Sequence, residues 1–210
     1  MEHNKWFQSE TLPTPEGLII LSGPIPSEQL NEYTMHEGLH AFRRPPEQHK
    51  ALVEIAALPE GRIIAAVIAG IIVGYVTFHY PDEMERWSET KLDNLIELGA
   101  IEVAKPYRTY GIGKRLIKLA FLAGQLDNCI VFTTEYYWHW DLDGTGLSVW
   151  DYRKLMENLM KCVNMVWFAT DDPEICSHPA NCLMVRVGPD VPLSSVEQFD
   201  HIRFHQRFMY

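Results

Sequence analysis

The stretch Arg108-Thr109-Tyr110-Gly111-Ile112-Gly113 stands between two segments of different pattern. The segment before it, Leu95–Val103, is apolar and of strand length, and the apolar residues after it recur at helical spacing. A strand, a glycine-bearing turn and a helix in this order form a cradle for anions. Glycine lets the backbone approach phosphate oxygens, and the unpaired N–H groups of the first helical turn point at them. The stretch therefore predicts a phosphate-binding turn.

Local charge supports a polyphosphate ligand. The chain is acidic, with 18 Lys and Arg against 28 Asp and Glu and a formal net charge of −10. Five cations nevertheless surround the turn with no acid between them: Lys105, Arg108, Lys114, Arg115 and Lys118. A local positive potential within an acidic protein attracts polyphosphates. We therefore expect the pyrophosphate of coenzyme A or of a nucleotide here, although a solvated helix face would also carry such charges.

The composition of the 210 residues argues against several classes of protein. The acidic balance of the chain, with no basic face or arm, argues against a nucleic-acid binder, which neutralises phosphates with such cations. Met1–Lys5 is not followed by an apolar core, so no signal peptide is predicted. The four cysteines form no CxxC pair and are too sparse for a disulfide framework, and Cys129 reads as an inert buried thiol. We expect a cytoplasmic protein with reduced thiols that binds neither nucleic acid nor membrane.

One apolar run, Ile63–Phe78, is nearly continuous. It is shorter than the roughly 20 residues that cross a bilayer. A turn signal, Ala69-Gly70, lies in its middle, and most of its residues are small or β-branched. The run therefore predicts a hairpin of two buried strands, Arg62–Ala69 and Ile71–Tyr80.

The order of the remaining elements predicts a mixed α/β fold. The other expected strands are Leu18–Leu21, Leu95–Val103, Ile130–Tyr136, Met165–Thr170 and Cys182–Val187. The expected helices run from Ser27 to about His40, over Glu47–Ala57, after the glycine turn, over Val149–Cys162 and over Ser194–Tyr210. We expect one catalytic domain over 18–175, an N-terminal extension over 1–17 and a C-terminal helical extension over 176–210 that packs on the same domain.

Val103, Pro106, Arg108, Gly111 and Gly113 follow a known pattern. They resemble the coenzyme A signature of the GNAT N-acetyltransferase superfamily, and the resemblance spans about Leu18 to Thr170. It implies a twisted mixed β-sheet flanked by helices, acetyl-CoA as co-substrate and no metal. 

Five further stretches resemble one branch of this superfamily, which is linked to acetoin utilisation. They are Phe42–His49, Leu58–Ile64, Thr133–Asp141, Trp167–Asp171 and His178–Met184. This resemblance implies acetylation of a protein lysine, with acetyl-CoA synthetase as the target and inactivation as the result.

The resemblance also assigns residues to coenzyme binding. They are Ile101, Val103, Arg108, Thr109, Tyr110, Gly111, Ile112, Gly113 and Lys114. In the superfamily, main-chain groups of the strand before the turn pair with the pantetheine, and a bulge aims one N–H donor at the acetyl oxygen. Gly99 would permit such a bulge. A donor there stabilises the negative charge that develops on the carbonyl oxygen.

Two glutamates, Glu97 and Glu102, interrupt the apolar strand before the turn. A carboxylate in such a strand is costly unless it is paired or used. Deprotonation of an acceptor ammonium needs a base whose pKa is raised toward neutral. Glu97 matches the position of the base in the lysine-acetylating branch, whereas Glu102 lies nearer the thioester. The sequence leaves both candidates open, with a structural salt bridge as the alternative.

A second polar cluster follows the next strand. It contains Glu135, Tyr136, Tyr137, His139 and Asp141. Glu135 is a further candidate for the catalytic machinery, and Tyr136 or Tyr137 would protonate the leaving thiolate. An aromatic loop packed on the core would show the same residues. The usual tyrosine of the superfamily in the following helix has no clear match, because Tyr152 lies near the start of that helix.

Two hypothetical zinc sites are alternatives to the acetyltransferase interpretation. His36-Glu37-Gly38-Leu39-His40 is a literal HExxH motif, in which a helix would present both histidines on one face. Gly38 weakens such a helix, and Pro45-Pro46 follows closely. Cys176, His178 and Cys182 offer only three donors in a loop, so neither reading is preferred.

A non-catalytic alternative is a protein that binds acetyl-CoA and regulates a partner by docking. Its support is a set of aromatic residues that would suit either an interface or a core. They are Trp138, Trp140, Trp150, Phe204, Phe208 and Tyr210.

Overall fold

The computed structural model describes residues 3–205, which fall into two compact units. The N-terminal unit comprises residues 3–79 and 98–125, and the C-terminal unit comprises residues 80–97 and 126–205. Strand β6 (Leu95–Val103) contributes its first three residues to the C-terminal unit and the others to the N-terminal unit. Both units contain strands and helices, so the predicted mixed α/β class is confirmed.

The strands of the N-terminal unit form an antiparallel meander. β1 (Gln8–Thr14) pairs with β2 (Gly17–Gly23), β2 with β4 (Arg62–Ile68), and β4 with β5 (Ile71–His79). The short β3 (Thr34–Met35) runs parallel to β5. The predicted hairpin is confirmed as β4 and β5, and the predicted strand before the glycine turn is confirmed as β6.

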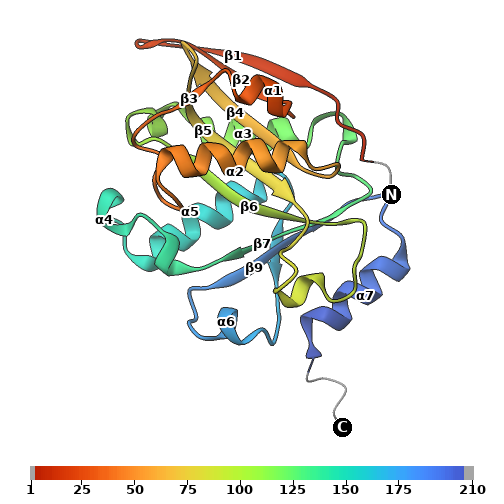
Figure 1. The fold of residues 1–210 in the computed structure, drawn as a ribbon. Coiled ribbons are helices and arrows are strands. Elements are labelled where there is room, and N and C mark those ends of the chain that lie inside the picture. Colours follow the sequence, from red (N-terminus) through yellow and green to blue (C-terminus); the bar gives the residue numbers. More distant parts are fainter. Residues whose placement is uncertain (1–2, 206–210) are drawn as a thin grey trace. The chain divides into compact units, whose positions relative to one another are not determined.

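Two helices cover opposite faces of this meander. α2 (Pro45–Ala57) lies across one face (Figure 1), where its Leu52 packs in a core with Ile63 and Tyr75. Gly74, next to Tyr75, faces the other way, since a Cβ there would lie 3.3 Å from Ile112 at the start of α3 (Ile112–Ala120). The α2 helix begins at the two prolines, whose fixed φ suits a first helical turn.

The predicted helix from Ser27 to about His40 is wrong. α1 spans only Ser27–Leu30, and the chain then adds to the sheet. Thr34 donates its N–H to the Gly70 carbonyl at 3.0 Å, and His36 donates to the Ile72 carbonyl at 2.9 Å. These bonds to the edge of β5 replace the helical bonds that the spacing suggested.

The strand β1 was not predicted from the sequence. Its residues alternate between exposed and half-buried, and none is fully buried, so it carries little hydrophobic signal. Pro13 lacks an N–H donor and is tolerated because β1 pairs on one side, with β2.

The C-terminal unit is a smaller sheet with its own core. The first residues of β6 pair in parallel with β7 (Ile130–Glu135), β7 pairs antiparallel with β9 (Cys182–Val187), and β9 pairs with β8 (Val166–Phe168). Its helices are α4 (Leu142–Thr145), α5 (Val149–Lys161), α6 (Pro173–Cys176) and α7 (Leu193–Arg203). Trp87, Phe132 and Phe199 meet in the core of this unit, and Phe199 comes from α7.

The predicted C-terminal helix corresponds to α7, which ends at Arg203. Phe208 and Tyr210, named above as interface candidates, lie outside the described residues. Within residues 3–205, the helices are all too short or too polar to cross a bilayer.

Candidate active site

The glycine-bearing turn, which we predicted to bind phosphate, has the expected order of strand, turn and helix. The 3₁₀ helix η2 (Lys105–Tyr110) follows β6, and Gly111 then adopts a left-handed conformation with φ of 69°. The first bond of α3 runs from the Arg115 N–H to the Gly111 carbonyl at 3.3 Å. The N–H groups of residues 112–114 precede that bond, so they are the donors that a helix start offers to an anion.

Three side chains around the turn bond other parts of the N-terminal unit. Arg108 donates from Nε to the Val103 carbonyl at 2.9 Å, which ties the turn to the end of β6. Tyr110 donates its hydroxyl to Glu16 at 2.6 Å, and Arg115 forms an exposed ion pair with Glu10 at 3.2 Å. Sequence reasoning missed both acidic partners, because Glu10 lies on the unpredicted β1 and Glu16 lies in the turn that joins β1 to the predicted β2.

β5 closely approaches the strand that was expected to pair with pantetheine. Ile101 and Val103 are half-buried on β6. Gly74 on β5 lets the strands come together, since a Cβ there would lie 3.2 Å from the Glu102 carbonyl oxygen. At Gly99, a Cβ would lie 2.4 Å from Nε2 of His79. Gly99 is therefore required for the packing of His79, a reason that the sequence did not suggest.

Glu102 is buried and hydrogen-bonded within the N-terminal unit. One carboxylate oxygen accepts the Ala41 N–H at 2.8 Å, and the other accepts the Tyr75 hydroxyl at 2.9 Å. Burial, and then the charge of Glu102, raises the pKa of Tyr75. Glu102 thus links Tyr75 on β5 to Ala41 in the loop after the HExxH residues. The two hydrogen bonds offset the unfavourable free energy of burying its carboxylate.

Glu135 is likewise buried with a partner. Trp140 donates from Nε1 to its carboxylate at 3.0 Å. Burial raises the pKa of Glu135 to about 7, and the Trp140 bond opposes that shift. Because side chains alternate along β7, Glu135 projects to the face opposite to Phe132.

Glu97 differs from these two glutamates. It lies opposite Phe132 in the parallel register of β6 and β7, and it shares a sheet face with the core residue Leu95. The residue is only 8% exposed, and no hydrogen bond to its carboxyl group is present among residues 3–205. Burial, and then the charges of Glu85 and Asp82, raises the pKa of Glu97 to about 8.

Further acids lie around the same face. The pKa of Glu85 is raised by desolvation and then by the charges of Asp82, Glu174 and Asp172. Tyr136 donates its hydroxyl to Glu174 at 3.2 Å, and burial raises the pKa of that hydroxyl. Tyr136 thus bonds Glu174, whose charge acts on Glu85, and these acids were not identified from the sequence.

The residues after β7 form a stack of aromatic rings. Tyr136 lies parallel to Trp138 at 4.7 Å between centroids, Tyr137 packs on His178 at 4.3 Å, and Trp140 stacks on Tyr152 at 5.3 Å. Trp138 remains 47% exposed and Trp150 50% exposed. In the second polar cluster, some aromatic rings therefore pack on neighbouring rings and others are exposed at the surface. Asp141 of this cluster caps α4 by accepting the Gly144 N–H at 2.9 Å.

The described residues do not support either hypothetical zinc site. Residues 36–40 are not helical, so His36 and His40 do not share a helix face. The Nδ1 atom of His36 accepts the Gly38 N–H at 2.9 Å. Among residues 3–205, no three His, Cys, Asp or Glu side chains are grouped to hold a metal ion.

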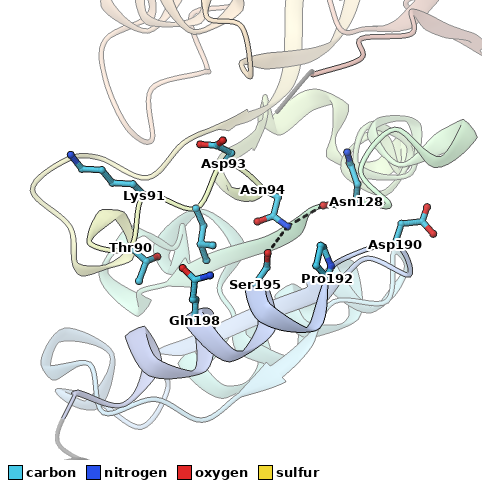
Figure 2. A pocket seen from close by; sticks show the side chains of 10 residues that line it. Thr90, Lys91, Asp93, Asn94, Asn128, Asp190, Pro192, Ser195 and Gln198 are labelled. Atoms are coloured by element: carbon cyan, nitrogen blue, oxygen red, sulfur yellow. Dashed lines mark hydrogen bonds between the residues drawn. The ribbon is translucent and has the colours of Figure 1, made fainter.

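A polar hollow of about 450 Å³ lies elsewhere in the C-terminal unit, between the 90–94 loop and the start of α7 (Figure 2). Asn94 donates from Nδ2 to Ser195 at 3.1 Å and to the Asn128 carbonyl at 3.4 Å across its wall. The described residues that line it include none of the predicted catalytic or coenzyme-binding residues. The hollow is therefore separate from the candidate site.

Comparison with known proteins agrees with these features. The model of the acetyltransferase (GNAT) family matches residues 30–138. The chain is 55% identical to the acetoin utilization proteins AcuA of Bacillus licheniformis and Bacillus subtilis, over 210 residues and the full length of each chain. The crystal structure of an acetoin utilization protein from Exiguobacterium sibiricum is 54% identical, with a TM-score of 0.95 over 99% of this chain and 98% of that one. The predicted resemblance is confirmed: this chain belongs to the GNAT family and is an acetyl-CoA-dependent acetyltransferase linked to acetoin utilization.

Proposed function

We propose that the enzyme acetylates a lysine side chain of another protein, that this protein is acetyl-CoA synthetase, and that Glu97 is the general base. The observation that carries the proposal is the state of Glu97. It is a buried carboxyl group without a hydrogen-bond partner in the described chain, and its pKa is raised to about 8. A base with a pKa near the working pH is the most effective one.

In this proposal, the N–H groups at the start of α3 bind the pyrophosphate of acetyl-CoA, with Arg108 and Lys114 nearby. The main chain of Ile101–Val103 binds the pantetheine. Glu97 takes a proton from the lysine ammonium, and the neutral amine attacks the thioester carbonyl carbon. The carbon–sulfur bond then breaks, and the coenzyme thiolate takes up a proton. The products are acetyl-lysine and coenzyme A.

Tyr136 is the proposed proton donor to the thiolate. A tyrosine hydroxyl keeps its proton at neutral pH because its ordinary pKa is about 10, and burial raises the pKa of Tyr136 further. Glu102 and Glu135 already accept hydrogen bonds from Tyr75, Ala41 and Trp140. We therefore assign them to holding the loops in place rather than to the proton transfer.

The test is the transfer of labelled acetyl from acetyl-CoA to proteins of a bacterial extract, followed by mass spectrometry of the labelled bands. A labelled lysine on acetyl-CoA synthetase, with loss of synthetase activity, is the expected result. Label on a small amine alone, with no labelled protein, would contradict the protein acceptor. Label on other proteins but not on the synthetase would contradict the target and leave the reaction class intact.

A further inference from the structure

Four acidic residues of the C-terminal unit come from three segments that lie near one another. Asp82 and Glu85 precede the 3₁₀ helix η1 (Arg86–Ser88), Glu97 is on β6, and Glu174 is on α6. Trp87 of η1 packs on Phe132, the register partner of Glu97, with 5.2 Å between ring centroids, and Arg86 pairs with Asp172 at the N-cap of α6. The charges of Asp82 and Glu85 raise the pKa of Glu97, and those of Asp82 and Glu174 raise the pKa of Glu85. Three segments far apart in the sequence therefore contribute acids to one region.

This region has little compensating positive charge. Arg86 directs its guanidinium to Asp171 at 2.9 Å and to Asp172 at 3.4 Å. Asp172 also caps α6 through the N–H groups of Glu174 and Ile175. Within residues 3–205, the four carboxylates named above form no ion pair with a Lys, Arg or His side chain.

Glu97 is the strongest sign that the region awaits a ligand. More than nine-tenths of this residue is buried, and the surrounding charges are negative. A buried carboxylate is costly unless a cation or hydrogen-bond donors compensate for it. No cation or donor for the ionised carboxylate of Glu97 is present among residues 3–205, so an arriving cation would stabilise its charged form.

The aromatic rings beside the acids also suit a cation. The Tyr136 hydroxyl contacts Glu174 at 3.2 Å, and its ring stacks on the half-exposed Trp138. Aromatic faces attract ammonium and guanidinium groups. The described acids are not grouped as metal ligands, so an organic cation fits this region better than a metal ion.

We propose that Asp82, Glu85 and Glu174 form the entrance for the acceptor, which recognises the lysine ammonium and the basic residues that flank it in the partner protein. This inference rests on the proposed function, because it names what the acceptor must carry. The three entrance residues are exposed, whereas Glu97 behind them is buried. The entrance attracts the cationic segment, and the arriving ammonium compensates the charge of Glu97.

The experiment measures the KM for acetyl-CoA synthetase and kcat with the double variant Asp82→Asn/Glu85→Gln. The assay runs at about pH 9, where Glu97 is largely ionised. The matched control is Asp143→Asn/Glu197→Gln, which removes the same charge from exposed acids outside the entrance. Both proteins are also tested for acetyl-CoA binding and for thermal unfolding, so that loss of folding is recognised.

The expected result is a KM at least about tenfold higher for the entrance variant, with kcat changed little and a weaker dependence of kcat/KM on salt. The control should change KM less than about twofold. An unchanged KM and salt dependence in the entrance variant, while wild type acetylates the synthetase, would overturn this inference alone. No acetylation of any protein by wild type would overturn the proposed function and the inference with it.

Discussion

The basic turn after β6 and the acidic entrance differ in charge and in how the sequence builds them. The turn collects Lys105, Arg108 and Lys114 within one short stretch, at the start of a helix. The entrance collects Asp82, Glu85 and Glu174 from distant parts of the chain. A positive region suits the polyanionic acetyl donor, and a negative region suits a cationic acceptor. Under these proposals, one acidic protein would carry two recognition regions of opposite sign.

The largest effect is expected from the buried glutamate behind the entrance. Glu97→Gln removes the proposed base, so kcat should fall by about 100- to 10,000-fold. Acetyl-CoA binding, measured by calorimetry, should remain close to wild type because the turn is untouched. 

Glu135→Gln is the matched control for that change, since Glu135 is an equally buried glutamate with a raised pKa. It projects to the other face of β7 and bonds Trp140, so its kcat should stay within about threefold of wild type. Similar losses in both variants would remove the distinction that we draw between the two glutamates.

A second test removes charge from the basic turn. Hydrogen bonds to charged groups are worth about 1.5–3 kcal/mol, so Lys114→Gln should raise the KM for acetyl-CoA by about 10- to 100-fold. The KM for the acceptor protein should not change. Lys118→Gln is the control, because Lys118 lies in the last turn of α3, away from the helix start. Equal effects of the two substitutions would indicate general charge attraction rather than a site at the helix start.

A third test separates backbone conformation from coenzyme binding. Gly111 and Gly146 have almost the same φ, 69° and 67°, and a Cβ at either position would meet no atom within 4 Å. An alanine in this conformation costs about 1–2 kcal/mol, so both alanine variants should lose that stability in urea unfolding. Only Gly111→Ala should also weaken acetyl-CoA binding. Weakening by Gly146→Ala would mean that loss of stability, and not the turn, explains the effect.

The sequence was sufficient for features whose signal is local. The hairpin β4–β5, the strand β6 and the turn were all predicted, because each has an apolar period or a glycine in its own segment. The strand β1 was missed because both of its faces are partly polar. The helix expected through His40 was wrong because β5 supplies bonding partners that lie far away in the sequence.

The same limit applies to the candidate site. The sequence named Glu97 and Glu102 together and could not choose between them, since both are acids in an apolar strand. The difference arises from tertiary neighbours: Tyr75 and Ala41 bond Glu102, whereas Glu97 faces Glu85 and Asp82. Those two acids lie in a charged loop whose position against β6 has no sequence signal.

The smallest predicted effect tests that neighbourhood directly. Glu97 must be ionised to accept a proton, so kcat/KM should rise with pH along a limb whose apparent pKa is about 8 in wild type. The charge of Glu85 raises the pKa of Glu97, so Glu85→Gln should move this limb to lower pH by a fraction of a unit. Glu197→Gln should leave the limb in place.

A limb that stays at the wild-type pH in Glu85→Gln would mean that burial alone sets the pKa of Glu97. The entrance would then act on the acceptor but not on the base. A limb that persists in Glu97→Gln would instead assign the titration to another group. The difference in hydrogen bonding between Glu97 and the glutamates Glu102 and Glu135 would then not identify the base.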